Sequence, residues 1–231
     1  RLYRAISDVH AVDLATEVTR QSPWAVLCDR VRRQGFIRGG DQFLFKIFDL
    51  LFLRRQEESE ARRFLNDDLP ALIIPSLNSI EGISFLRSRG YDVVICLATS
   101  IVGKEALSIP ERGFVNVHPG VLPAYRGTGN LWAVVNEDWS NLGCTVHWMN
   151  EKIDAGAVIA IARLQCPPPS LWAMHVAAMQ QGVDELAALF CRDVLLKEKV
   201  DVSGQAARYY GWYGFIDYFR FKRALARKTG Q

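Results

Sequence analysis

Short apolar runs alternate with helical patterns through the middle of the chain. Three runs of strand length lie at 71–74, 92–98 and 114–118, and the second is almost continuously apolar. Continuous apolar runs of this length are typical of parallel strands that are covered on both faces. We therefore predict an α/β fold with a mainly parallel, twisted, Rossmann-like sheet and helices on both of its faces.

The pattern continues with two more strands and a long helix. The runs at 142–149 and 158–162 are predicted as antiparallel strands that extend the sheet. Ser170 follows three prolines and is placed to cap a helix, because a serine oxygen can accept a backbone N–H of the first helical turn. The apolar stripe from Trp172 to Val194 has helical spacing and is interpreted as core.

The amino-terminal region departs from the usual beginning of such a sheet. Residues 1–10 predict an amphipathic helix where a hydrophobic strand and a glycine turn are normal, so we expect the sheet to lack its first strand or to obtain it from elsewhere. Residues 12–19 are a candidate second strand. Between 20 and 66 we predict a helix that starts at Pro23 and then a buried helix, and this region is our candidate for the choice of substrate. The apolar face of the second helix comprises Phe43, Leu44, Ile47, Leu50 and Leu51.

Charge, hydropathy and cysteine usage narrow the range of partners. The formal net charge is +3 and the basic residues are dispersed, whereas proteins that bind nucleic acid usually present a concentrated basic face. No stretch approaches the ~20 apolar residues of a membrane span. We therefore expect neither nucleic acid nor membrane as a partner. The five scattered cysteines have no metal-ligand spacing, so we predict a cytoplasmic protein with reduced thiols and no metal.

The length of the chain suits one large α/β domain with a small appendage. We divide it into a domain over 1–204 and a tail over 205–231 that is rich in aromatic and basic residues. Such a tail could stack on a nucleotide or on single-stranded nucleic acid. Packing back onto the domain, or against a second subunit, is the favoured interpretation. A homodimer is one of the arrangements that this interpretation allows.

Polar residues gather at the end of the third predicted strand. Asn116 and His118 are two positions apart, so alternation along the strand directs both side chains to the same face. The carboxyl ends of parallel strands are where open α/β sheets bind their ligands. Asp154 lies in a second loop that follows the β-rich run at 144–149. An amide, an imidazole and a carboxylate are therefore candidates for one site.

Four short patterns carry a resemblance to a known family. They are Asn-Val-His-Pro at 116–119, Leu-Pro-x-x-Arg-Gly at 122–127, Gly-Cys-Thr-Val-His at 143–147 and Ile-Asp-x-Gly at 153–156. In this order they resemble the catalytic core of the formyltransferases that use 10-formyltetrahydrofolate. The resemblance covers about a third of the chain, from Asp92 to Arg163.

The resemblance implies a role for individual residues, transferred position by position. It implies that Asn116, His118 and Asp154 are catalytic. The cofactor contacts that it implies are Ser100, Ile101, Val102 and Ile153. The substrate contacts that it implies are Arg126, Gly127 and Asn130. The cofactor is expected to be 10-formyltetrahydrofolate and the substrate a small-molecule amine.

The three catalytic candidates suit formyl transfer chemically. The amide of Asn116 and a donor from His118 suit the oxyanion that forms on the formyl group. Asp154 suits the orientation of the imidazole and the movement of a proton, directly or through water. This chemistry requires no metal. His147 lies on a strand near the site, and we leave open whether it lines the pocket or packs within the sheet.

The identity of the acceptor separates several alternatives. A sugar N-formyltransferase acting on a nucleotide-linked amino sugar fits best. A transfer-RNA formyltransferase carries a further domain, for which the residues after Arg163 leave little room. A glycinamide-ribonucleotide formyltransferase is less similar at 126–130 and lacks a counterpart of residues 20–66. A hydrolase of the formylated cofactor and a non-catalytic binding relative remain as the other hypotheses.

Overall fold

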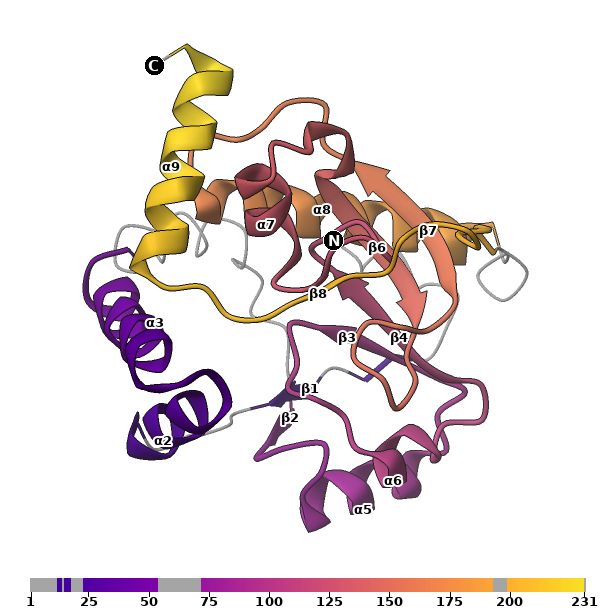
Figure 1. Ribbon diagram of the computed structural model, residues 1–231. Coiled ribbons are helices and arrows are strands. Elements are labelled where there is room, and N and C mark those ends of the chain that lie inside the picture. The colour runs from indigo at the N-terminus through magenta and orange to yellow at the C-terminus, as the bar shows by residue number, and fades with distance from the viewer. Residues whose placement is uncertain (1–11, 14, 18–22, 54–71, 193–198, 231) are drawn as a thin grey trace.

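The computed structural model describes residues 12–13, 15–17, 23–53, 72–192 and 199–230, and a four-stranded sheet lies at its centre (Figure 1). The strand order is β3 (Val93–Leu97), β4 (Gly113–His118), β6 (Gly143–Trp148) and β7 (Val158–Arg163). β3 and β4 are parallel, whereas β4–β6 and β6–β7 are antiparallel. The strands predicted at 92–98, 114–118, 142–149 and 158–162 are confirmed in position and direction, whereas the strand predicted at 71–74 lies in a separate two-stranded sheet.

Two short pairs of strands lie beside this sheet. β1 (Ala15–Glu17) runs parallel to β2 (Leu72–Ile74), and β5 (Arg126–Gly127) runs parallel to β8 (Tyr209–Tyr210). Three of the five strand pairings in the described part of the chain are thus parallel, as the mainly parallel prediction requires.

The predictions for the amino-terminal region have a mixed outcome. β1 falls within the candidate strand at 12–19 and is confirmed as a strand. The helix predicted over 1–10 lies outside the described residues.

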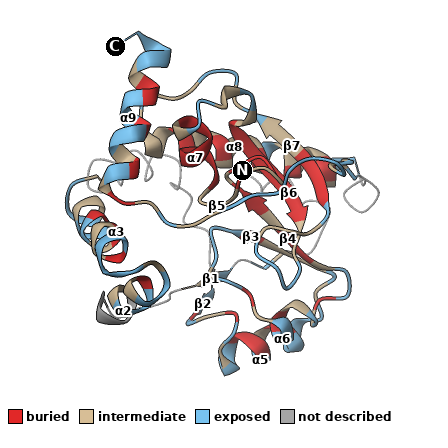
Figure 2. Ribbon diagram, in the orientation of Figure 1, coloured by how far each residue is buried: buried red, intermediate tan, exposed pale blue. Residues whose placement is uncertain are grey.

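Helices cover both faces of the sheet. α8 (Leu171–Cys191) packs on one face, and α5 (Ile80–Arg89) and α6 (Lys104–Leu107) pack on the other. The other helices of the described residues are α2 (Pro23–Gln34), α3 (Phe36–Phe48), α7 (Gly129–Val135) and α9 (Phe215–Thr229), with a π-helical turn at Asp49–Leu53 and a 3-10 turn at Trp139–Asn141. Val117 of β4 shares a core with Leu186 of α8. Phe114, three positions earlier in the same strand, shares a core with Leu86 of α5. Alternate residues of β4 therefore face different helices, and Figure 2 shows the buried residues concentrated in this strand, β6 and α7.

α8 begins where the sequence predicts. Ser170 is its N-cap, and its hydroxyl oxygen accepts the backbone N–H of Ala173 at 3.1 Å. A Cβ on Gly182 would lie 2.4 Å from Sγ of Cys144 and 2.6 Å from Cγ1 of Val117, so this glycine allows the helix to approach the sheet closely. Val194, the last residue of the predicted stripe, lies outside the described residues.

The buried face of α3 is not the predicted one. Leu44, Ile47, Leu50 and Leu51 are exposed. Phe45 is buried instead, with its ring centroid 5.4 Å from that of Tyr213 and 5.2 Å from that of Phe215. Asp41 accepts the backbone N–H of Phe215 at 3.1 Å. The prediction is wrong because α3 docks on the tail through an edge of mixed aromatic and polar residues, which an apolar pattern does not reveal.

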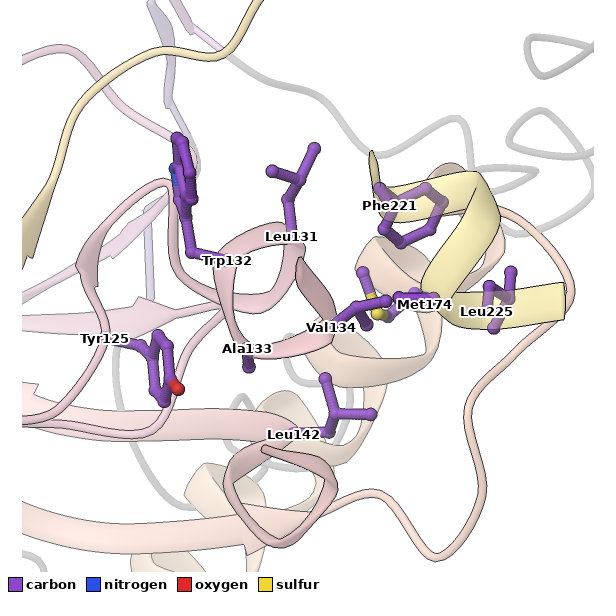
Figure 3. Packing of buried hydrophobic residues seen from close by; sticks show 10 residues of the cluster. Tyr125, Leu131, Trp132, Ala133, Val134, Leu142, Met174, Phe221 and Leu225 are labelled. Carbon is purple, nitrogen blue, oxygen red and sulfur yellow. The ribbon is translucent and has the colours of Figure 1, made fainter. Parts of the chain in front are cut away.

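The tail packs back onto the domain, as the favoured interpretation states. Figure 3 shows Phe221 and Leu225 of α9 beside Leu131 and Val134 of α7 and Met174 of α8, and all five belong to one core. The segment before α9 pairs with β5 and so crosses the molecule next to the end of β4.

The packing of α9 is testable by a matched pair of substitutions. Phe221→Ala should lower the free energy of unfolding by roughly 3–5 kcal/mol, because it empties the space of a ring that is 0% exposed. Phe219→Ala removes a ring on the same helix that is 66% exposed, and it should cost less than about 1 kcal/mol. Urea denaturation measures both, and equal costs would contradict the packing.

Candidate active site

Asn116 and His118 point to the face of the sheet opposite α8, because they alternate with the valines of β4 that pack on that helix. In the antiparallel register with β6, Asn116 lies opposite His147 and His118 lies opposite Thr145. The end of β4 and the facing part of β6 thus bring four polar side chains to one face of the sheet.

Asp154 reaches the same place from the loop between β6 and β7, with a backbone φ of 47°. Its Oδ2 accepts the backbone N–H of Gly127 at 2.8 Å and lies 3.6 Å from Nδ1 of His118. Its Oδ1 lies 3.8 Å from Nε2 of His147. The carboxylate therefore stands between two imidazole rings and is fixed by a backbone donor.

The ring of His118 is oriented by a backbone carbonyl. Its Nε2 lies 3.0 Å from the carbonyl oxygen of Tyr125. A carbonyl oxygen only accepts hydrogen bonds, so Nε2 carries a hydrogen and the neutral ring has its lone pair on Nδ1. This lone pair faces the Asp154 carboxylate, and a proton taken up at Nδ1 would lie between the two groups.

His147 has the opposite arrangement. Its Nδ1 lies 2.9 Å from the carbonyl oxygen of Trp148, and its Nε2 lies 3.3 Å from Nδ2 of Asn116. Burial lowers the pKa of His147, and the nearby His118 lowers it further, against the opposite effects of the hydrogen bond to Trp148 and the charge of Asp154. The ring is therefore a neutral acceptor that contacts the amide of Asn116.

These side chains border a cleft of about 320 Å³. The predicted cofactor contacts Ser100, Ile101, Val102 and Ile153 all line it. Asn116, His118, His147 and Asp154 line it as well, and so do His175 and Met179 of α8 and Tyr209, Tyr210 and Trp212 of the tail. The structure thus brings the catalytic and cofactor candidates to one cavity.

Not all of the predicted substrate contacts line the cleft. Gly127 lines the cleft. The guanidinium of Arg126 donates two hydrogen bonds to the carbonyl of Ile153, which fastens the two loops of the site to each other. Asn130 is buried outside the lining, where its amide exchanges hydrogen bonds of 2.8 and 2.9 Å with the backbone of Gly143. Its side chain is therefore engaged in holding the start of β6.

Glu17 fixes the loop that carries three of the cofactor candidates. Its carboxylate accepts the backbone N–H of Ser100 at 2.8 Å, the hydroxyl of Ser100 at 2.7 Å and the backbone N–H of Leu77 at 3.0 Å. Burial alone would raise the pKa of Glu17, but the hydrogen bonds from Ser100, Leu77 and Ser76 lower it below its ordinary value. The sequence shows only a charged residue at the end of a candidate strand.

Sequence reasoning also missed the side chains that close the cleft from far away in the chain. His175 belongs to a helix whose apolar stripe is interpreted as core, yet it lines the cleft, and burial together with His118 lowers its pKa. Tyr209 and Trp212 are 54% and 53% exposed and stand at the same cleft. The aromatic content of the tail indicated that these two side chains could bind a ligand, but it did not indicate that they line this cleft.

The described residues also contain a second cavity, but no metal-binding cluster and no membrane-spanning helix. A larger cavity of about 510 Å³ between α2 and α3 is lined mostly by apolar side chains, such as Leu27, Val31 and Phe43, and lacks the convergent polar groups of the smaller cleft. Within the part of the chain that the structure describes, no three His, Cys, Asp or Glu side chains are arranged to hold a metal ion. No helix in that part has the length and hydropathy to cross a membrane.

Comparison with known proteins shows what the segment that carries this site is similar to. Residues 77–170 match the family model described as formyl transferase, which confirms the resemblance drawn from the sequence. The matched segment contains the whole of β4, the loop of Asp154 and the 98–102 loop.

Two relatives illustrate how far the likeness extends. The methionyl-tRNA formyltransferase of Thermotoga sp. (strain RQ2) is 34% identical over 137 residues, which cover 57% of this chain and 44% of that protein. The GDP-perosamine N-formyltransferase of Brucella melitensis biotype 1 is 35% identical over 89 residues, which cover 38% of this chain and 34% of that protein. The chain therefore spans less than half the length of these relatives.

Solved structures share the fold. A sugar N-formyltransferase from Shewanella sp. FDAARGOS_354 matches with a TM-score of 0.54 at 18% identity, over 94% of this chain and 89% of that chain. A 4-N formyltransferase from Francisella tularensis matches with a TM-score of 0.50 at 18% identity, over 75% of this chain and 73% of that chain. At these identities the likeness establishes the α/β architecture.

Glu17→Gln tests the anchoring of the 98–102 loop. The variant keeps the size of the side chain but turns an amide N–H toward the Ser100 donors, so it should be less stable than the wild type at neutral pH. The folded-state pKa of Glu17 lies below its ordinary value of 4.5. The difference in stability is therefore fully present above that value and is lost as the pH falls through the lowered pKa.

Urea denaturation of both proteins between about pH 7 and about pH 3 measures this difference. A difference that stays constant over this range would contradict a role for the ionised carboxylate.

Proposed function

We propose that this chain transfers a formyl group from 10-formyltetrahydrofolate to a primary amine. The observation that carries the proposal is the convergence of Asn116, His118 and Asp154 on one cleft. This cleft lies largely within the segment that matches the formyl transferase family.

The residues of the cleft fit a folate. A volume of about 320 Å³ lies at the lower end of the range for small-molecule sites. Ile101 and Ile153 are exposed apolar side chains that line it, which suits a flat aromatic ring. When bound, the donor supplies a formyl group on its N10 nitrogen.

The oxygen of the formyl group gains negative charge as the amine attacks, and Asn116 is placed to stabilise it. The side-chain nitrogen of Asn116 carries two hydrogens. One of them is directed to Nε2 of His147, which leaves the second for the formyl oxygen. A preorganised donor of this kind stabilises developing charge without reorganisation at the moment of reaction.

His118 and Asp154 serve the movement of the proton. A new C–N bond to the attacking amine forms and the bond from the formyl carbon to N10 breaks, so one proton must pass from the amine to N10. Nδ1 of His118 and the carboxylate of Asp154, 3.6 Å apart, are the groups that accept and return it.

The aromatic side chains of the tail support a nucleotide-linked amino sugar as the acceptor. Tyr209 and Trp212 stand half-exposed at the cleft, and bases stack well on such rings. Tyr210 between them is stacked on Tyr125 and Trp132, with ring centroids 5.4 and 5.3 Å away, and this fixes the segment. The relative from Brucella melitensis is named GDP-perosamine N-formyltransferase, which agrees with such an acceptor.

Methionyl-tRNA is the second candidate acceptor, because the relative from Thermotoga sp. is named for it. A glycinamide ribonucleotide and water are the other acceptors that the same chemistry allows. Formyl release from 10-formyltetrahydrofolate, measured with each of these acceptors and with none, separates them.

His118→Ala should lower turnover by roughly a hundredfold or more, the scale of a lost proton-transfer group. Asp154→Asn keeps the shape and removes the charge, so it should reduce kcat more than it weakens donor binding. Steady-state kinetics measure kcat and KM of each variant, and thermal melting checks that each variant is folded. Full formyl transfer by a folded His118→Ala protein would remove the basis of the proposed mechanism.

Trp212→Ala should raise KM for a nucleotide-linked amino sugar roughly tenfold, since base stacking on an aromatic ring contributes about 1–3 kcal/mol. KM for the formyl donor should change little. Phe219→Ala, an exposed aromatic of the same tail outside the cleft lining, is the matched control. If both variants leave the acceptor KM unchanged, a nucleotide is not bound at this rim.

A further inference from the structure

His147 stands beside the proposed catalytic residues without a part in the proposed movement of the proton. It lies on β6 directly opposite Asn116 and is 2% exposed. Burying an imidazole carries a cost unless its nitrogens are hydrogen-bonded, and both ring nitrogens of His147 have partners. Whether each partner donates or accepts a hydrogen bond indicates the role of His147.

The backbone settles which nitrogen of His147 carries the hydrogen. The carbonyl of Trp148 can only accept, so Nδ1 is the donor in this 2.9 Å contact. Burial lowers the pKa of the ring, and the neutral ring then has a lone pair on Nε2. This lone pair faces Nδ2 of Asn116 at 3.3 Å.

We propose that His147 is a positioning residue that acts through Asn116: its Nδ1–H tautomer accepts a hydrogen bond from the Asn116 amide and thereby turns the second amide hydrogen toward the formyl oxygen. The inference rests on the proposed function for the identity of that oxygen. The orientation of the amide itself rests only on the contacts of His147.

The need for such a residue follows from the symmetry of a carboxamide. Rotation by half a turn exchanges the NH₂ and the oxygen of Asn116, and an amide oxygen facing the cleft would repel the formyl oxygen. With His147 present, the rotated amide would place its oxygen against the lone pair on Nε2. The Oδ1 of Asp154, 3.8 Å from the same nitrogen, adds a second acceptor there. The productive orientation is therefore the favoured one.

Two substitutions at His147 separate the acceptor from the packing of the ring. His147→Phe keeps an aromatic ring in the sheet but has no acceptor, and it should lower kcat about tenfold or more with little change in the KM of the formyl donor. His147→Gln places an amide oxygen near the position of Nε2 and should recover most of that loss. Both variants are checked for folding by thermal melting. Equal activity of folded Phe and Gln variants would overturn the proposal.

A double-mutant cycle tests whether His147 acts through Asn116. If it does, His147→Phe should cause little further loss in an Asn116→Ala background, because the group that it orients is already absent. Losses that multiply independently would show that His147 acts by another route and would overturn the inference.

A spectroscopic readout makes the test independent of turnover. In ¹⁵N-labelled protein at neutral pH, His147 should have a protonated Nδ1 and an unprotonated Nε2. The side-chain NH₂ signal of Asn116 should shift in His147→Phe. It should stay in place in the control His175→Phe, which changes a half-buried histidine of the same cleft that lies on α8.

The two readouts distinguish failure of the inference from failure of the proposed function. A protonated Nε2 on His147, or an Asn116 signal that does not respond to His147→Phe, would overturn the positioning role even if formyl transfer is found. Absence of formyl transfer together with the expected signals would overturn the proposed function and leave the orientation of Asn116 established.

Discussion

The hydrogen bond from the backbone of Gly127 to the carboxylate of Asp154 is the interaction on which the arrangement of the site depends. It measures 2.8 Å and joins the loop after β4 to the loop between β6 and β7. Gly127 has a φ of +82°, and a Cβ there would lie 2.1 Å from the carbonyl oxygen of Tyr210. Only glycine can therefore pair with the tail and hold Asp154 at once. The same peptide brings together the catalytic candidates and the aromatic rim.

Backbone carbonyls set the electrostatics of the site. Tyr125 and Trp148 each accept a hydrogen bond from one histidine, so Nε2 of His147 is left to accept from the Asn116 amide and Nδ1 of His118 is left facing Asp154. The carboxylate of Asp154 and Nδ1 of His118 then lie 3.6 Å apart, beside the Asn116 amide that His147 contacts. Such a cluster is suited to receive a proton from a substrate, and no side chain outside the sheet and its loops is needed to create it.

The sequence predicts the parts of this molecule that depend on local pattern. The strands that carry the site follow from apolar runs, and the cap of α8 follows from Ser170. Asn116 and His118 share a face because they alternate with buried valines.

Other features depend on long-range contacts that a local pattern does not contain. The prediction of the buried face of α3 was wrong because this helix packs on the tail. The hydrogen bond from Gln42 to the carbonyl of Trp212 joins residues that are 170 positions apart in the chain. Asn130 resembles a substrate contact in its motif, yet its amide holds Gly143. Glu17 joins loops at Leu77 and Ser100, which only the folded structure brings together.

The most direct test of the central claim is a crystal structure of the protein with tetrahydrofolate bound. The account predicts the pteridine ring against the 98–102 loop and Ile153, with the N10 nitrogen within reach of Asn116, His118 and Asp154. Tetrahydrofolate bound elsewhere, or in this cleft with N10 directed away from these three side chains, would contradict it.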